Sequence, residues 1–373
     1  MMHLAICSDI KEFKEDQLRD EQWSRKFPGS GWITCLYDLA ARSSINISSG
    51  DIAIQNIKSN KWVATDVYVI QDMASKEAEV LLALGAKPFL ITCFESPLYA
   101  PSFYRNIDHI ADKFIYKMGF PFTGNQFGIA GSMGRMGFRF PTFYVKDIKD
   151  IRPWSPRKNL VLVAANKYRV SKVFKASRLS MRGLMRQVKT LAWKLFDSNY
   201  RHALAYSLHD RRLEAIEHFS AGKNFDLYGK GWDRWDELPS TWTRRLEQLT
   251  RGRYQGVCQD KIDLISNYRY SICFENMAMP GYITEKMIDC FVAGTLPIYL
   301  GAPDVENFVP ANSFIDMRVF QSLDQVEVFM SSLDDKTAMA MIMAGRDYLK
   351  TELGQMHSYE GFADQVFKLA MTC

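Results

Sequence analysis

Short apolar runs alternate with helical patterns along most of this chain, and this alternation limits the fold more than any other feature of the sequence. Runs such as His3–Ser8 and Pro88–Phe94 are typical of buried strands, whereas Trp32–Ala41 and Ala74–Leu84 have the residue spacing of helices. Strands that alternate with helices favour a parallel sheet covered by helices on both faces. We therefore predict an α/β fold. Further strands are expected at Trp62–Gln71, Phe114–Tyr116, Leu160–Ala165 and Phe225–Tyr228, and further helices at Ile107–Lys113, Arg211–Phe219 and from Leu323 onward.

The chain has 373 residues, which suggests two domains at roughly 150 residues each. The segment Ile151–Lys158 contains two prolines and separates two α/β patterns, so we place the domain boundary there. The sequence predicts a first domain over 1–152, a second over 159–330 with a basic insertion at 167–201, and a C-terminal helical segment over 331–373.

The composition is that of an ordinary globular protein, with 47% hydrophobic and 24% charged residues. Its seven cysteines are widely spread and form no CxxC pair, which is typical of reduced thiols rather than of a disulfide framework. Its six histidines form no HExxH group, so we expect no metal held by the protein. Uncharged apolar runs of about 18 residues are absent, and the N-terminus resembles a first strand more than a secretory signal.

Basic charge is concentrated in the insertion at 167–201, which carries ten Lys or Arg residues and one acid. Within 171–196, apolar residues fall on one helical arc and cations on a neighbouring arc. Such a helix is suited to anionic membrane surfaces, but packing on its own protein with a solvated basic edge is the somewhat favoured alternative. No recognised nucleic-acid module accompanies these cations, so we expect no nucleic-acid partner.

One βαβ unit is well defined in the second half of the chain. A strand at Ser271–Phe274 precedes a helix with Thr284 as its N-cap and Gly294 at its end, and a strand at Thr295–Leu300 follows. In doubly wound sheets, ligands bind beyond the carboxyl ends of the strands, where helix N-termini attract anions. Lys286 in the first turn is either a ligand for an anion such as a diphosphate or a solvated lysine. Glu285 is either a ligand or an acid that favours the helix dipole.

Glu95 also lies beyond a strand, after Pro88–Phe94, where it is either a general base or an ordinary loop acid. The sequence contains no DxD triplet, so a diphosphate would have to be neutralised by cations and backbone N–H groups. The glycine-rich stretch Gly124–Gly137 is expected to be a flexible loop or a substrate-facing loop. Because no GxGxxG follows a strand, a nicotinamide-dependent oxidoreductase is disfavoured.

The segment Phe274–Met317 resembles the donor-binding signature of the α1,3-fucosyltransferases, glycosyltransferase family 10. The similarity rests on the pieces FEN, GYITEK, AGTLPIYLGAP and FVPANSFID, which occur in the family's order and spacing. Weaker similarity is found at Phe94–Pro97, which resembles the family's ESP motif, and at Arg212 upstream of the DLYG stretch Asp226–Gly229.

This resemblance implies a GT-B arrangement, in which two Rossmann-like domains face each other across a cleft. The acceptor would bind at the first domain and GDP-fucose mainly at the second, in an inverting reaction without a metal or other cofactor. Glu95 would be the base, and the donor-binding residues would be Arg212 and Lys286 at the diphosphate, Glu285 at donor hydroxyls, Tyr282 and Asn276 at nucleotide and sugar, and Asn166 as a further contact.

Two features depart from the family pattern. Some bacterial relatives have a second acid two residues before the ESP glutamate, where this chain has Cys93, and the basic insertion interrupts the pattern. We expect a cytoplasmic enzyme, peripheral to the inner membrane face through 171–196, that modifies a lipid-linked glycan in surface polysaccharide or lipopolysaccharide synthesis. The alternatives are a transferase for another GDP-sugar and a non-catalytic protein that binds sugar nucleotides or membranes. The acceptor, the linkage and the oligomeric state do not follow from the sequence.

Overall fold

The computed structural model describes residues 2–27, 29–120, 139–166, 188, 191–192, 195–222, 224–233, 247–248 and 250–373. The chain forms two compact units. Unit 1 comprises Met1–Glu95, Ser102–Ile148 and Leu349–Cys373, and unit 2 comprises Ser96–Pro101 and Lys149–Tyr348. The main boundary after Ile148 lies close to the proline-containing segment. The C-terminal segment expected over 331–373 is divided between the units, because its last helices pack on the sheet of unit 1.

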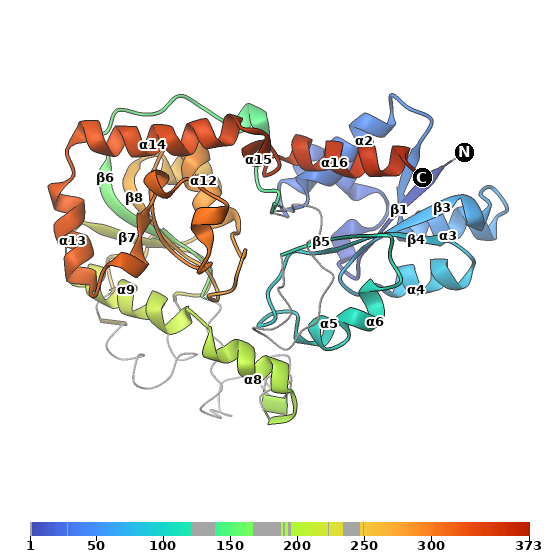
Figure 1. Cartoon of the computed structure of the whole chain (residues 1–373), viewed down its shortest axis with the longest axis horizontal. Coiled ribbons are helices and arrows are strands. Elements are labelled where there is room, and N and C mark those ends of the chain that lie inside the picture. The colour runs from blue at the N-terminus through green and yellow to red at the C-terminus, as the bar shows by residue number, and fades with distance from the viewer. Residues whose placement is uncertain are drawn as a thin grey trace. The chain divides into compact units, whose positions relative to one another are not determined.

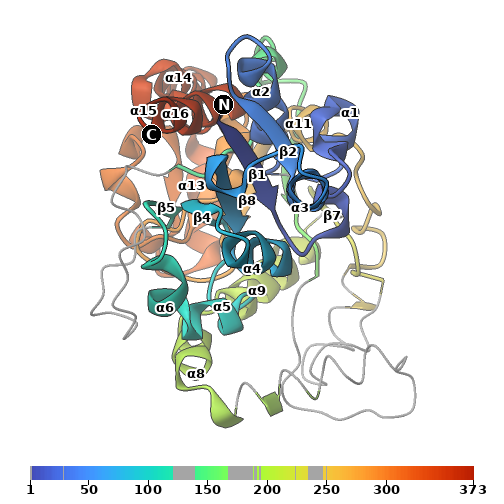
Figure 2. The ribbon, with the colours of Figure 1, turned by 90° about the vertical axis from the view of Figure 1, so that its right-hand side faces the viewer.

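Unit 1 contains a five-stranded parallel sheet in the order β2-β1-β3-β4-β5. Helices α2 and α16 pack together on one face, whereas α3 and α4 cover the other (Figure 1, Figure 2). Right-handed crossovers explain this distribution. The connection from β1 to β2 runs towards one edge of the sheet, whereas the connections from β2 to β3 and from β3 to β4 run towards the other edge. Their helices therefore lie on opposite faces. The strands are β1 His3–Cys7, β2 Asn46–Ser49, β3 Val67–Asp72, β4 Lys87–Cys93 and β5 Tyr116–Gly119. The helices are α1 Glu21–Ser24, α2 Gly31–Ala40, α3 Gly50–Lys58, α4 Lys76–Ala83, α5 Pro101–Arg105, α6 Ile107–Ala111, α15 Glu352–Gln355 and α16 Tyr359–Met371.

Unit 2 contains a second five-stranded parallel sheet, in the order β10-β9-β8-β6-β7. Helix α9 lies on one face and α12 on the other, with α14 packed outside α12 (Figure 1). The strands are β6 Lys158–Val163, β7 Phe225–Tyr228, β8 Tyr268–Phe274, β9 Leu296–Leu300 and β10 Ile315–Asp316. The helices include α8 Ser198–Ala205, α9 His209–Ala221, α11 Lys261–Ile265, α12 Glu285–Ala293, α13 Leu323–Ser332 and α14 Asp335–Lys350.

The parallel α/β fold predicted from the alternation is confirmed in both units. The chain also contains a strand, β2, and a helix, α3, that the sequence did not predict. The β2 sequence Asn46–Ser49 is polar, so its burial beside β1 comes from pairing and not from an apolar pattern. The strand expected from Trp62 begins only at Val67, because a 3-10 turn at Ala64–Asp66 precedes it.

Two expected features fall outside the described residues. The glycine-rich loop Gly124–Gly137 is one, and nearly all of the basic segment 171–196 is the other. Among the helices that the structure describes, none is both long enough and apolar enough to span a membrane.

Candidate functional site

A buried carboxylate, Glu275, lies at the carboxyl end of β8 and binds several groups at this edge of unit 2. Glu275 directly follows the strand, and its side chain is 0% exposed. Its carboxylate accepts hydrogen bonds from the N–H and hydroxyl of Thr284, at 2.8 and 2.7 Å, and from the Lys286 ammonium at 2.9 Å. Gly301 leaves the room for this group, because a Cβ there would lie 2.6 Å from the Cγ of Glu275. Glu275 therefore ties the end of β8 to the start of α12.

Thr284 stands at the N-cap position of α12, as the sequence predicts, but its side chain caps no N–H group of the helix. Its hydroxyl instead donates to Glu275 and accepts a hydrogen bond from Lys286 at 2.8 Å. The competing donor to the hydroxyl oxygen is the Lys286 ammonium, and a charged donor binds that oxygen more strongly than a backbone N–H does. The N-terminus of α12 is thus left without a cap from the side chain of Thr284.

The first turn of α12 carries alternating charges. Lys286 lies 3.5 Å from Glu285, and Lys261 of α11 lies 4.0 Å from Glu285 and 2.7 Å from Asp289. Burial alone would raise the pKa of Glu285, but the two ammonium groups hold it well below its ordinary value of 4.5. Burial opposes the charge of Lys286, whose pKa is nevertheless raised by Glu275 and Glu285. Both side chains are therefore ionised at neutral pH.

Arg212 approaches the same edge from α9. The residue is 3% exposed, and its Nη2 donates to the carbonyl oxygens of Phe274 and Glu275, at 2.7 and 3.3 Å, and to Oδ1 of Asn276 at 3.2 Å. Within the described residues, Nε and Nη1 make no hydrogen bond, so two guanidinium nitrogens remain for a ligand. Burial lowers the pKa of Arg212, although the nearby acids and the phenols of Tyr99 and Tyr282 counteract it.

The loop between β8 and α12 is held from both sides. The carbonyl of Asn276 accepts a hydrogen bond from Leu208 at the start of α9, and Gly281 donates to Asp304 at 2.8 Å. Tyr282 is 1% exposed, and its carbonyl accepts a hydrogen bond from the Tyr299 hydroxyl at 3.4 Å. The side chain of Tyr282 is thus buried at this loop, and its phenol acts on the charge of Arg212.

Asn166 lies beyond the carboxyl end of β6. Its Nδ2 donates to the carbonyl of Gly231 at 3.1 Å, and Trp232 Nε1 donates to the carbonyl of Ala164 at 2.6 Å. These contacts join the loops that follow β6 and β7. Gly229 makes the approach possible, because it has a φ of +137° and a Cβ there would lie 2.0 Å from the Ala164 oxygen.

Glu95 belongs to unit 1, two residues past β4, and lines a cavity of about 260 Å³ at the carboxyl edge of that sheet. Its backbone carbonyl accepts a hydrogen bond from the Tyr104 hydroxyl at 2.7 Å. The cavity walls are mostly apolar and aromatic, and the cavity contains a second carboxyl group, Asp72. The lining includes Ile6, Phe13, Phe27, Trp32, Ile70, Thr92, Phe94 and Phe140.

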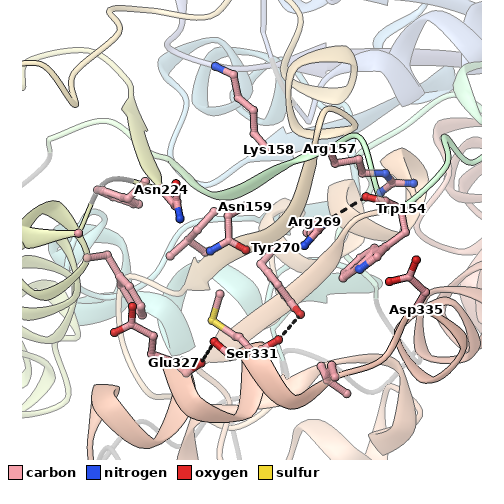
Figure 3. A pocket seen from close by; sticks show the side chains of 16 residues that line it. Trp154, Arg157, Lys158, Asn159, Asn224, Arg269, Tyr270, Glu327, Ser331 and Asp335 are labelled. Atoms are coloured by element: carbon pink, nitrogen blue, oxygen red, sulfur yellow. Dashed lines mark hydrogen bonds between the residues drawn. The ribbon is translucent and has the colours of Figure 1, made fainter.

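A larger cavity in unit 2, of about 510 Å³, lies at the opposite edge of the sheet (Figure 3). It is lined by Lys158 at the start of β6, Phe225 at the start of β7 and Tyr270 near the start of β8. Figure 3 shows Arg269 and Tyr270 with hydrogen-bond partners inside the protein, which are the carbonyls of Trp154 and Met330. Because parallel sheets bind ligands at their carboxyl edges, we do not assign the donor to this cavity in spite of its size.

The structure thus brings Arg212, Asn276, Glu285 and Lys286 together at one edge of unit 2, with Tyr282 behind them and Asn166 beyond the next strand. Their roles towards a ligand remain predictions. The sequence analysis named Thr284 only as an N-cap and did not select Glu275 or Asp72. Glu275 and Thr284 lie inside the FEN and GYITEK pieces and could have been found there, whereas Asp72 ends a strand without any motif.

Comparison with known proteins finds a family model that is similar to the part of the chain containing this edge. Residues 187–355 match the C-terminal model of glycosyltransferase family 10 (fucosyltransferase), and the matched range contains every residue of the α9–α12 cluster. Over this range the chain is similar to glycosyltransferase family 10. The resemblance noted in the sequence is thereby confirmed.

The curated relatives match over part of their length. An alpha-(1,3)-fucosyltransferase of Helicobacter pylori is 30% identical over 105 residues, which are 28% of this chain and 22% of the relative. An alpha-(1,4)-fucosyltransferase of Arabidopsis thaliana is 31% identical over 36% of this chain and 31% of its own. A mouse 4-galactosyl-N-acetylglucosaminide 3-alpha-L-fucosyltransferase is 36% identical over 20% of this chain and 21% of its own. The matches span less than a third of each of these relatives.

Solved structures resemble the whole chain. An alpha1,3-fucosyltransferase with GDP has a TM-score of 0.50 at 15% identity, covering 100% of this chain and 89% of that one. A glycosyltransferase from Rickettsia africae has a TM-score of 0.56 at 10% identity, covering 100% and 98%. At these identities the likeness concerns the fold alone. The two parallel-sheet units are those of a GT-B glycosyltransferase, which confirms the expected fold class.

Proposed function

We propose that this chain is an inverting glycosyltransferase that moves fucose from GDP-fucose to a hydroxyl of a glycan acceptor. The observation that carries the proposal is the cluster at the carboxyl edge of unit 2, where Arg212 and Lys286 adjoin the N-terminus of α12. A solved alpha1,3-fucosyltransferase of similar fold is described with GDP, the nucleotide part of the donor we propose for this chain.

Cations and backbone groups at this edge suit a diphosphate. The Nε and Nη1 atoms of Arg212 and the ammonium of Lys286 would contact its oxygens, together with the first N–H groups of α12. Glu285 is 31% exposed at its side chain, which leaves its carboxylate accessible to sugar hydroxyls. Asn276 and Asn166 provide amides at the ends of β8 and β6. Tyr282, buried behind the loop, would act by fixing the loop's position.

The reaction we propose is a single displacement. The Glu95 carboxylate takes the proton of the acceptor hydroxyl as that oxygen attacks the anomeric carbon, and the bond from that carbon to the GDP oxygen breaks. Negative charge grows on the departing diphosphate. Arg212, Lys286 and the end of α12 stabilise this charge more in the transition state than in the bound donor, which accelerates the reaction.

The proposal includes a reaction without a metal ion, because the diphosphate's partners are cations of the protein.

We further propose that the protein acts in the cytoplasm, at the inner membrane face through 171–196, with a lipid-linked glycan or surface polysaccharide as acceptor. Binding to anionic vesicles by the full chain, compared with a chain lacking 171–196, tests the membrane part. Equal sedimentation of both chains would contradict it.

The function is tested by fucose transfer from GDP-fucose in the presence of a chelator. We expect transfer by the wild type and a loss of about 100-fold or more in Glu95→Gln, with GDP-fucose affinity unchanged. Glu79→Gln, an exposed carboxyl on α4, is the matched control and should retain full activity. Unchanged transfer by Glu95→Gln would remove Glu95 from its role. Failure of the wild type with every GDP-sugar tested would refute the function itself.

A further inference from the structure

Two carboxyl groups share the cavity at the carboxyl edge of unit 1. Asp72 is the last residue of β3, and Glu95 follows the neighbouring strand β4. Both line the cavity of about 260 Å³. Ser8, beyond the end of β1, and Thr92 of β4 flank the Asp72 carboxyl on either side. Asp72 therefore adds a second carboxyl group to the cavity that Glu95 lines, from the adjacent strand.

The surroundings of Asp72 offer its negative charge little compensation. The Ser8 and Thr92 hydroxyls donate to it over 3.4 and 3.5 Å, at the long limit of hydrogen bonding. In the described part of unit 1, the groups that act on Asp72 are these two hydroxyls and the Glu95 carboxylate. Burial raises the pKa of Asp72 to about 7, the hydroxyls oppose the shift weakly, and the charge of Glu95 adds to it.

Burial, with a smaller contribution from the charge of Glu95, raises the pKa of Asp72 to about 7, so its protonated form predominates at pH 6. A carboxyl group that stays protonated is a hydrogen-bond donor, which a carboxylate is not. The cavity thus combines one donor, one anionic acceptor and aromatic walls that include Trp32 and Phe94. Sugar rings present hydroxyls at their edges and apolar C–H faces, and this combination complements them.

We propose, resting on the function proposed above, that Asp72 binds the acceptor sugar as a neutral carboxylic acid beside Glu95. Asp72 donates its proton in a hydrogen bond to an acceptor oxygen next to the hydroxyl that Glu95 deprotonates. Asp72 keeps that proton throughout the reaction, and the proton of the attacking hydroxyl goes to Glu95. Asp72 thereby selects and orients the acceptor, whereas Glu95 performs the proton transfer.

The kinetic test uses two substitutions of Asp72 and the disaccharide 4-galactosyl-N-acetylglucosamine, the acceptor for which the mouse relative is named. Asp72→Ala removes the donor, so the acceptor KM at pH 6 should rise by about tenfold or more while kcat changes less. Asp72→Asn keeps a neutral donor of similar size, so it should retain the wild-type KM at pH 6.

The pH profile separates this role from a merely structural one. Wild-type kcat/KM for the acceptor should fall as the pH rises through about 7, because Asp72 ionises and loses its donor. Asp72→Asn should lack this fall, and Asp38→Asn, an exposed carboxyl on α2, should retain it. An unchanged KM in Asp72→Ala, or an alkaline fall that persists in Asp72→Asn, overturns the proposal.

A readout independent of turnover is the titration of ¹³C-labelled aspartate carboxyls by NMR in the full chain. One resonance should titrate near pH 7 and be absent from Asp72→Asn. If no aspartate titrates near that pH, the proposal is refuted even when fucose is transferred. If the titration is found but the wild type neither transfers sugar to any glycan acceptor tested nor binds one, the proposed function fails and this role fails with it.

Discussion

At the scale of single residues, the cluster in unit 2 depends on one buried anion. Glu275 is the group to which Thr284 and Lys286 both bind, and it contacts no solvent. A buried carboxylate without partners is costly, and three hydrogen bonds offset that cost here. Lys286, with 12% of its side chain exposed, is correspondingly held in one place instead of extending into solvent. A preorganised cation of this kind is what stabilisation of a leaving diphosphate requires.

Glu275→Gln should therefore destabilise the fold as well as the site. Removing the buried carboxylate leaves Lys286 with only the more distant Glu285 as an anionic partner, so we expect a loss of about 2–4 kcal/mol in the free energy of unfolding. Chemical denaturation at neutral pH measures it. Glu306→Gln, which removes a solvent-exposed partner of Arg318, is the control and should change stability little. Equal effects of the two substitutions would contradict the importance of Glu275.

A second residue-scale prediction concerns His357 in unit 1. The side chain is 1% exposed, its Nδ1 lies 3.0 Å from the carbonyl of Phe140, and burial lowers its pKa to about 3. Above pH 6.5 the imidazole is neutral in both states and contributes no pH dependence. Below that pH the unfolded chain binds a proton that the folded chain does not, so stability falls towards pH 3.

The substitution His357→Asn tests whether His357 causes this loss of folding stability as the pH falls. The amide nitrogen of Asn can replace Nδ1 but does not titrate, so the loss of stability between pH 6.5 and 5 should become shallower by up to about 1.4 kcal/mol per pH unit. Urea denaturation at several pH values measures the slope. His202→Asn, at an exposed position on α8, should leave it unchanged. An identical slope in wild type and His357→Asn would show that His357 is not the group responsible.

At the scale of elements, the loops that follow the strands are packed against each other closely enough to require particular residues. The loop after β7 passes so near the end of β6 that only glycine fits at position 229. Asn166 and Trp232 then bond across the two loops. The position of the amide at Asn166 is therefore a consequence of loop packing as well as of its own strand.

Gly229→Ala should disrupt this packing severely. Its φ of +137° is unfavourable for alanine, and the new Cβ would overlap the Ala164 carbonyl, so we expect a loss of more than about 3 kcal/mol. Gly252→Ala is the matched control, because Gly252 has a φ of +95° but nothing within 4 Å of the added Cβ. Its cost should be about 1 kcal/mol. Equal losses in thermal or chemical unfolding would show that the close approach is unimportant.

At the scale of the whole molecule, patterns in the sequence predict what depends on local order. The strand–helix–strand unit around α12 follows from an apolar run, an N-cap threonine and a C-terminal glycine, and the structure confirms all three elements. Long-range packing is not visible in such patterns. The return of α16 to unit 1 depends on the fit of Tyr359 against Gly31, where a Cβ would lie 2.5 Å from the ring.

The candidate site shows the same limit. Arg212, Lys286 and Glu95 were found because they belong to motifs or follow recognisable strands. Asp72 was missed because its environment is created by two other strands and by Glu95, which the sequence places far along the chain. Glu275 was missed because its bonds to Thr284 and Lys286 exist only once the loop has folded back.

The central claim is that the carboxyl edge of unit 2 binds the GDP group without a metal ion. Calorimetric titration of GDP in the presence of EDTA tests it most directly, comparing Lys286→Met with Lys158→Met at the larger cavity of the opposite edge. In Lys286→Met the buried Glu275 carboxylate loses its ammonium partner, which could itself weaken GDP binding. The double variant Glu275→Gln/Lys286→Met removes that charge and so excludes this effect. We predict that wild type and Lys158→Met bind equally, whereas both Lys286 variants bind about tenfold or more weakly. Loss of binding in EDTA, or weaker binding by Lys158→Met alone, would contradict the account.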